Sequence, residues 1–249
     1  MTILHIFSLS MGHIINKADN WGDYMDNIIG KTISGFIMLI VIMGILIFLP
    51  AWTINYLQAW IYLLTFSLST ILITIYLLKN DQELLKRRLN AGSSAEKEKS
   101  QKNIQLMASV FFCLIYIIAG LDYHFHWSNI PLYISLLANI FVMLGFFIVF
   151  LVFKENSYTS AIIEVDKDQK VISTGMYSIV RHPMYFGAIL MLVFSGVALG
   201  SYWGLLIVVA LTFTIVARLL NEEKFLFKNL SGYDEYCEKV PYHLIPFIW

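Results

Sequence analysis

The chain has 249 residues and no net formal charge at neutral pH; 58% of its residues are hydrophobic and only 14% are charged. An average soluble domain carries about a quarter charged residues, so this composition excludes an ordinary soluble domain and indicates a membrane protein. Zero net charge gives no reason to expect a nucleic-acid partner, and two cysteines cannot build a disulfide framework or a thiolate metal site.

Four apolar stretches are long enough to cross a bilayer as helices. They comprise residues 33–49, 60–78, 104–121 and 132–153, and each lacks Lys, Arg, Asp and Glu. A further uncharged stretch, from Met184 to Ala217, is too long for one crossing and has Gly200-Ser201 near its middle, which predicts a helical hairpin. The sequence therefore predicts an all-α polytopic membrane bundle of about six transmembrane helices.

The basic residues predict how this bundle is oriented. With the N-terminus inside, all 17 Lys and Arg residues fall on one face. Because cytoplasmic loops accumulate Lys and Arg, we expect both termini to be cytoplasmic. The apolar segment 1–11 lacks a basic region before it, so we expect a helix lying at the membrane interface there instead of a signal peptide.

Two connecting segments differ in character. The cytoplasmic loop 79–103 is rich in Glu, Lys, Gly and Ser, which predicts a solvated linker without a catalytic grouping. Residues 156–180 alternate polar with β-branched side chains and predict a small hairpin or an ordered flap. We therefore divide the chain into N-terminal transmembrane helices (residues 1–153) and a C-terminal region (154–249) with the hairpin at 183–220 and a tail.

Polar residues gather at the two ends of the predicted hairpin. A Gly-x-Tyr-x-x-x-Arg-His-Pro-x-Tyr-x-Gly segment precedes it, and Arg-x-x-x-Glu-Glu, then Tyr-x-x-Tyr and Pro, follow it. The matching residues are Gly175, Tyr177, Arg181, His182, Pro183, Tyr185, Gly187, Arg218, Glu222, Glu223, Tyr233, Tyr236 and Pro246. This pattern resembles the isoprenylcysteine carboxyl methyltransferase family over about the last hundred residues, and Ala51-Trp52, Ala59-Trp60 and residues 122–131 resemble its bacterial branch more weakly.

The resemblance implies a membrane methyltransferase that uses S-adenosylmethionine, with a cytoplasmic-side cofactor pocket in the C-terminal half. It implies cofactor binding by Tyr177, Arg181, His182, Pro183, Tyr185, Gly187, Glu222, Glu223 and Tyr236. By the same analogy, Arg218 and Glu222 or Glu223 face the methyl acceptor. The acceptor is left open between a prenylcysteine-type carboxylate, a thiol and a lipid amine, with membrane lipids as further partners.

Physical chemistry is compatible with these assignments. A sulfonium cation needs aromatic rings and carboxylates near it, and methyl transfer needs alignment of donor and nucleophile without a metal. We expect His182 to orient the cofactor's carboxylate and Arg181 to lie near the lipid headgroups. Arg218, one helical turn before Glu222, can pair with it or hold an anionic substrate.

Alternatives remain at this stage. The C-terminal architecture is also similar to that of NADPH-dependent sterol reductases, and the scaffold is compatible with a membrane binding protein that catalyses nothing. Asp122, His124 and His126 lie close together in the sequence, but they fall in a short loop on the opposite face, and we expect no metal there.

Overall fold

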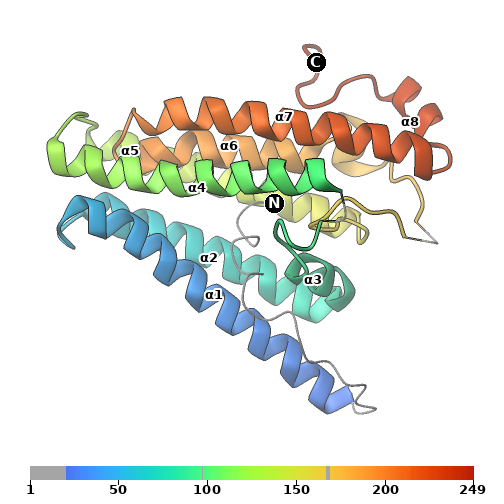
Figure 1. Cartoon of the computed structure of the whole chain (residues 1–249), viewed down its shortest axis with the longest axis horizontal. Coiled ribbons are helices and arrows are strands. Elements are labelled where there is room, and N and C mark those ends of the chain that lie inside the picture. The colour runs from blue at the N-terminus through green and yellow to red at the C-terminus, as the bar shows by residue number, and fades with distance from the viewer. Residues whose placement is uncertain (1–20, 97, 167–168) are drawn as a thin grey trace.

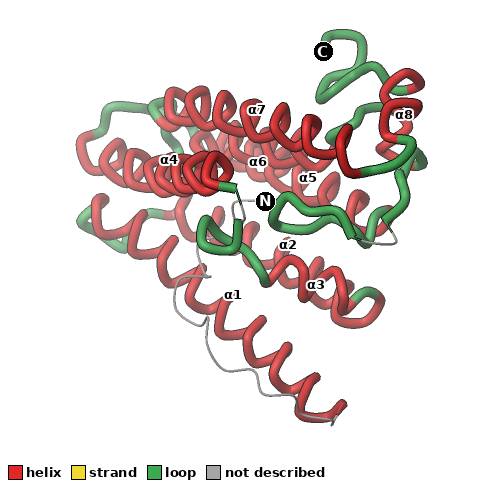
Figure 2. The backbone as a smooth tube through the Cα atoms, turned by 45° about the vertical axis from the view of Figure 1, so that its right-hand side comes forward, coloured by secondary structure: helices red, strands yellow, loops and turns green. Residues whose placement is uncertain are grey.

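The computed structural model describes residues 21–96, 98–166 and 169–249, so the predicted interfacial helix at residues 1–11 lies outside the described residues. The helices in chain order are α1 (Trp21–Ala51), α2 (Leu57–Asn80), α3 (Gln82–Leu89), α4 (Lys99–Phe125), α5 (Leu132–Glu155), the 3-10 turn η2 (Gly175–Ser178), α6 (Pro183–Ala198), α7 (Gly204–Asn229) and α8 (Tyr233–Lys239). The described part of the chain contains no β-strand (Figure 2). The predicted all-α bundle is confirmed.

Among the described residues, five helices are long and apolar enough to span a membrane: α1 from Ile28, α2, α4, α5 and α7. Together they make this an integral membrane protein. Helices α4 to α7 lie side by side, and α1 and α2 pack below them (Figure 1). Large apolar side chains on the outer faces are open to the surroundings, for example Leu72 at 67% and Phe213 at 71% exposure, as expected where lipid replaces water.

The hairpin of α6 and α7 forms as predicted, with its turn at Gly200. Gly200 has a φ of +81°, a left-handed conformation that glycine adopts without strain. Helix α6 has only 16 residues, which corresponds to about 24 Å at 1.5 Å per residue. It is therefore shorter than the roughly 30 Å of a bilayer's hydrocarbon core.

A buried chain of hydroxyl groups ties three helices together. Tyr62 of α2 lies 2.9 Å from the Tyr116 hydroxyl of α4 and donates to Ser195 of α6 at 2.9 Å. Ser195 in turn donates to the Met191 carbonyl at 2.8 Å. Because water is absent from a bilayer core, such polar groups must find partners within the protein, and here they fix α2, α4 and α6 against one another.

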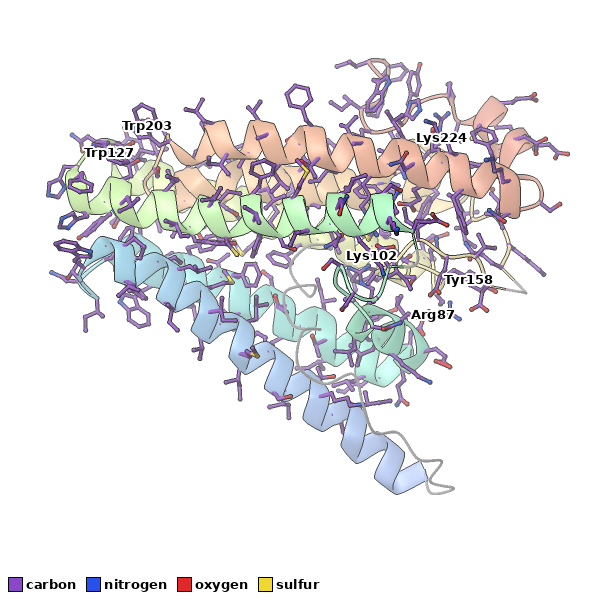
Figure 3. All side chains as sticks on the ribbon, viewed as in Figure 1. Arg87, Lys102, Trp127, Tyr158, Trp203 and Lys224 are labelled. Atoms are coloured by element: carbon purple, nitrogen blue, oxygen red, sulfur yellow. The ribbon has the colours of Figure 1, made fainter. Side chains whose placement is uncertain are left out.

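The two ends of the bundle differ chemically. Trp127 and Trp203 lie at one end, whereas Arg87, Lys102 and Lys224 lie at the other (Figure 3). At the tryptophan end the buried Asp122 carboxylate accepts hydrogen bonds from the Ser128 amide at 2.7 Å and the Ser201 hydroxyl at 2.5 Å. Asp122 thus holds two turns together.

Candidate functional site

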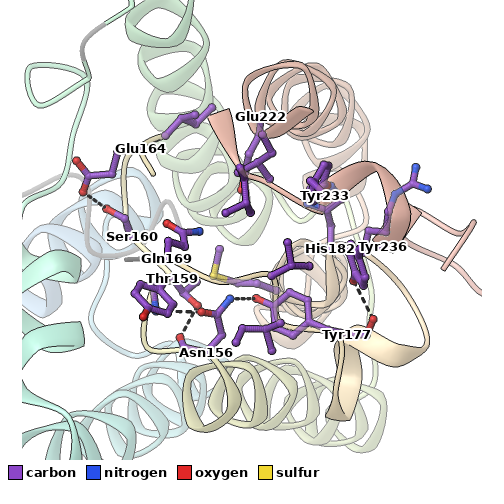
Figure 4. Close-up of a pocket in the computed structure, with 18 of the residues that line it drawn as sticks. Asn156, Thr159, Ser160, Glu164, Gln169, Tyr177, His182, Glu222, Tyr233 and Tyr236 are labelled. Carbon is purple, nitrogen blue, oxygen red and sulfur yellow. Dashed lines mark hydrogen bonds between the residues drawn. The ribbon is translucent and has the colours of Figure 1, made fainter. Parts of the chain in front are cut away.

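A cavity opens at the basic end of the bundle, between the loop after α5, η2, the start of α6, the end of α7 and α8 (Figure 4). Its empty volume, which includes open solvent at its mouth, is about 860 Å³. It is lined by Asn156, Tyr158, Thr159, Ser160, Ile162, Ile163, Glu164, Gln169, Lys170, Val171, Ile172, Tyr177, Arg181, His182, Pro183, Met184, Tyr185, Arg218, Glu222, Leu226, Leu230, Tyr233 and Tyr236.

The Arg181-His182-Pro183 segment is fixed at the cavity edge by backbone geometry. Gly175, with a φ of +56°, turns the chain into η2, and Pro183 is the first residue of α6, where its missing amide hydrogen is not needed. The amides of Arg181 and His182 donate to the carbonyls of Tyr242 and His243, each at 2.9 Å. The C-terminal tail is thereby fastened directly to this segment.

Glu223 is the centre of a charged cluster behind the cavity. Its carboxylate accepts a hydrogen bond from Arg181 Nε at 2.7 Å and lies 3.1 Å from His182 Nε2 and 3.0 Å from His243 Nε2. Arg181 also donates to the carbonyls of Val240 and Pro241, each at 3.2 Å. The side chain of Arg181 is only 8% exposed. Buried partners on α7 and the tail therefore hold Arg181, and its expected place near the lipid headgroups stays a prediction.

Glu222 faces the cavity, in contrast to its neighbour. It accepts a hydrogen bond from the Tyr185 hydroxyl and lines the cavity wall, whereas Glu223 does not. Figure 4 shows Glu222, His182, Tyr233 and Tyr236 grouped along one side of the cavity. A carboxylate among aromatic rings is a suitable environment for a cation.

Tyr177 is fixed at the cavity by two hydrogen bonds, one at its hydroxyl group and one at its backbone carbonyl. Asn156 donates to its hydroxyl at 3.1 Å, and Tyr236 donates to its carbonyl at 2.8 Å (Figure 4). Burial raises the pKa of the Tyr177 phenol to about 12, and burial also raises the pKa of Tyr236. Both phenols therefore stay protonated near neutral pH, so they can offer ring faces and hydrogen-bond donors but no anion.

Arg218 also lines the cavity, but its ion-pair partner comes from the N-terminal half. Its Nη2 lies 2.5 Å from Glu96 Oε1, and it donates to the Ala161 carbonyl at 3.2 Å and to Gln101 at 3.4 Å. Both Arg218 and Glu96 are almost fully buried. The Arg218–Glu222 pair that the sequence allows does not form, because Glu222 turns to Tyr185.

The segment 79–103 is consequently not a plain solvated linker, and that expectation is corrected. Asp81 caps α3 by accepting from the Leu84 amide at 2.9 Å, which starts a short helix beside the C-terminal region. From this segment Arg88 and Glu96 reach the surroundings of the cavity as buried side chains. No local sequence signal marks them, since their partners are far away in the chain.

Most of the cavity-lining residues that lie outside the motif come from the segment 156–172. Their described residues form an ordered flap without strands, so the hairpin alternative does not hold. Among the motif residues, those that line the cavity are Tyr177, Arg181, His182, Pro183, Tyr185, Arg218, Glu222, Tyr233 and Tyr236. Gly187 lies elsewhere, where a Cβ would come within 2.9 Å of the Gly145 carbonyl of α5.

Residues 133–231 match the family model described as phospholipid methyltransferase. Over these residues the chain is similar to phospholipid methyltransferases. The match starts at the beginning of α5 and ends just beyond α7, so it contains the flap, the Arg-His-Pro segment and both glutamates. The resemblance to isoprenylcysteine carboxyl methyltransferases is confirmed at the level of this group of membrane methyltransferases. No curated protein matches the chain.

Proposed function

We propose that this protein is an S-adenosylmethionine-dependent methyltransferase of the membrane, with the donor bound in the cavity between α6, α7, α8 and the flap. The observation that carries the proposal is the Glu222 carboxylate, which faces a cavity lined by Tyr177, Tyr185, Tyr233 and Tyr236, within a region of the phospholipid methyltransferase family. A carboxylate and the faces of aromatic rings both attract the positive charge of a sulfonium group, so this lining suits the methyl donor.

Each group of the chain then has a defined task. Glu222 and the tyrosines hold the cationic end of the donor, and the polar flap residues Asn156 and Thr159 offer hydrogen bonds to its other end. The bound donor supplies an electrophilic methyl group, whose bond to sulfur breaks as the acceptor's nucleophilic atom attacks in line. His182 and Arg181, both bound to Glu223, keep the start of α6 in place.

The acceptor is an apolar or small molecule that carries an oxygen, sulfur or nitrogen nucleophile. A carboxylate or thiolate attacks as an anion and needs little general-base help, whereas an amine must lose a proton. We also propose that the basic end of the bundle, which holds the cavity, is cytoplasmic, because Arg87, Lys102 and Lys224 all lie there.

A binding experiment tests this function directly. Purified protein in neutral detergent is titrated by calorimetry with S-adenosylhomocysteine, with sinefungin, which has an amine cation where the donor has its sulfonium, and with NADPH. We expect the first two ligands to bind and NADPH not to bind. Binding of NADPH alone would establish the reductase alternative, and binding of none of the three would establish a non-catalytic scaffold.

The charge of Glu222 gives the titration a sharper readout. Glu222→Gln should weaken sinefungin about tenfold more than neutral S-adenosylhomocysteine, because only the cation loses an attraction of about 1.4 kcal/mol. The matched control is Glu235→Gln, an exposed glutamate on α8. Equal weakening of both ligands by Glu222→Gln would contradict a sulfonium-facing role.

A further inference from the structure

The charge of the candidate cavity depends on residues that lie outside its wall. Among the described residues, the charged side chains that line it, leaving His182 aside, are three cations and two carboxylates: Lys170, Arg181, Arg218, Glu164 and Glu222. This lining alone has an excess of positive charge, which opposes the binding of a cation. Two carboxylates outside the lining reverse the sign, because Glu223 pairs with Arg181 and Glu96 pairs with Arg218.

Glu96 comes from the segment between α3 and α4 and is buried against Arg218. The side chains of Arg218 and Glu96 are 2% and 1% exposed, and Arg218 Nη2 lies 2.5 Å from Glu96 Oε1. Gly92, with a φ of +105°, turns this segment, and the Ala95 amide donates to the Gly92 carbonyl at 3.1 Å. Since Arg218 itself lines the cavity, the Glu96 carboxylate lies directly behind the cavity wall.

The same ion pair is held in place by the flap. Arg218 Nη2 also donates to the Ala161 carbonyl at 3.2 Å, and the Glu96 carboxylate accepts a hydrogen bond from the Ile163 amide at 3.4 Å. Ile163 lines the cavity, and Ala161 is fully buried. These backbone contacts keep the guanidinium against Glu96, so the two opposite charges stay together beside the cavity.

Stability alone does not account for this buried pair. Moving two charges out of water costs free energy, and apolar residues of similar volume often stabilise a fold as well or better. The position of the pair gives it a second effect, because charges inside a protein are screened much less by salt than charges at its surface. Glu96 therefore changes the electrostatic potential that a ligand in the cavity experiences.

We infer that Glu96 is a positioning residue that sets the charge of the donor cavity through Arg218. The inference rests on the proposed function. With Arg218 compensated by Glu96, the Glu222 carboxylate determines the sign of the potential at the cavity, which favours the sulfonium donor over S-adenosylhomocysteine, the product that lacks this charge. Glu96 lies outside residues 133–231, which match the family model, so the preceding segment tunes the preference for donor over product.

The test measures a ratio of two affinities by calorimetry in neutral detergent. Sinefungin and S-adenosylhomocysteine share their nucleoside and amino-acid ends, so the ratio of their dissociation constants reports the charge at the sulfur position. Glu96→Gln should weaken sinefungin about tenfold relative to S-adenosylhomocysteine, as one unit charge does at about 12 Å and an effective dielectric constant of about 20. Glu96→Asp keeps the charge and should keep the wild-type ratio.

The partner residue should shift the same ratio in the opposite direction. Arg218→Gln removes the cation and leaves the charge of Glu96, so sinefungin should gain about tenfold relative to S-adenosylhomocysteine. The double variant Glu96→Gln/Arg218→Gln should return close to the wild-type ratio. The matched control is Glu98→Gln, which removes an exposed carboxylate two residues away and should leave the ratio unchanged.

A purely structural pair gives different results. In that case Glu96→Gln and Arg218→Gln weaken both ligands equally, or neither variant folds, and the inference fails; if only one of them folds, its ratio decides. If the ratio shifts in Glu222→Gln but not in Glu96→Gln, the inference fails while the proposed function stands. If the wild-type protein binds neither ligand, the proposed function itself fails.

Discussion

Glu222 and Glu223 are adjacent in the chain, yet their carboxylates lie in different surroundings. Successive residues of a helix point about 100° apart, so one side chain faces the cavity and the other faces the tail. Glu222 accepts from Tyr185 at the cavity wall, whereas Glu223 joins Arg181, His182 and His243. The same chemical group thus faces the cavity at one position and joins the tail to α6 and α7 at the next.

Glu223→Gln should therefore act mainly on stability. It leaves the buried Arg181 guanidinium without its counter-charge, which typically costs about 3–5 kcal/mol. We expect a clear drop in the thermal unfolding midpoint in detergent, whereas Glu222→Gln should change it little. An unchanged midpoint for Glu223→Gln would mean that the cluster does not hold the tail.

His243 makes the same cluster sensitive to pH. Burial lowers the pKa of its imidazole, and the Arg181 guanidinium lowers it further, against the opposing effect of Glu223. The unfolded chain then binds a proton more readily than the folded protein, so stability is complete above about pH 6.5 and falls as pH decreases through the lowered pKa. Between pH 7.5 and 5.5, wild-type protein should lose more thermal stability than His243→Asn.

From the sequence alone, the grouping of the motif residues could be predicted because the motif is local, while their binding roles stay predictions. The Arg-His-Pro segment and the glutamates are set by Gly175, Pro183 and one helix, and most of the predicted residues do line one cavity. Arg88 and Glu96 could not be found in this way. Their partners lie on α7 or in the flap, and neither spacing nor periodicity records a contact between such distant segments.

Helices α5 and α6 approach closely through two glycines. A Cβ on Gly145 would lie 2.7 Å from the Gly187 carbonyl and 2.9 Å from the Met191 amide nitrogen. These atoms belong to the backbone and cannot move aside without shifting the helix. Because α6 begins at the cavity with Pro183, the packing of α5 against α6 also sets where the site lies.

Gly145→Ala should therefore destabilise the bundle. Overpacking of this kind costs about 1–3 kcal/mol, measured as a lower midpoint of thermal unfolding in detergent. Gly44→Ala on α1 is the matched control, since the nearest side chain to its Cβ would be 4.0 Å away. Similar midpoints for the two variants would show that α5 and α6 can separate without penalty.

At the level of elements, hydropathy predicted the long helices and their turn but not α3 or α8. Membrane spans are specified by runs of apolar residues, which a single sequence displays directly. Helix α3 has eight residues, three of them basic, and α8 has seven. Helices this short have little stability alone, and both form because their buried sides pack on the rest of the protein.

At the scale of the whole molecule, Arg87, Lys102 and Lys224 lie at the opposite end of the bundle from Trp127 and Trp203 (Figure 3). If the basic end is cytoplasmic, Lys102→Cys and Trp203→Cys should face opposite sides of the membrane. In a background with Cys113→Ser and Cys237→Ser, an impermeant maleimide should label only Trp203→Cys in right-side-out vesicles and only Lys102→Cys in inverted ones. The reverse pattern would place the cavity on the outer side.

The shortness of α6 has a kinetic consequence. This helix begins at the cavity and is shorter than the hydrocarbon thickness, so under the proposed function we propose that the cavity lies below the lipid surface and that an apolar acceptor reaches it by lateral diffusion without leaving its leaflet. Turnover is then governed by the mole fraction of acceptor among the surrounding lipids. Diluting the acceptor with inert lipid should slow the enzyme even when its amount per volume of suspension is held constant.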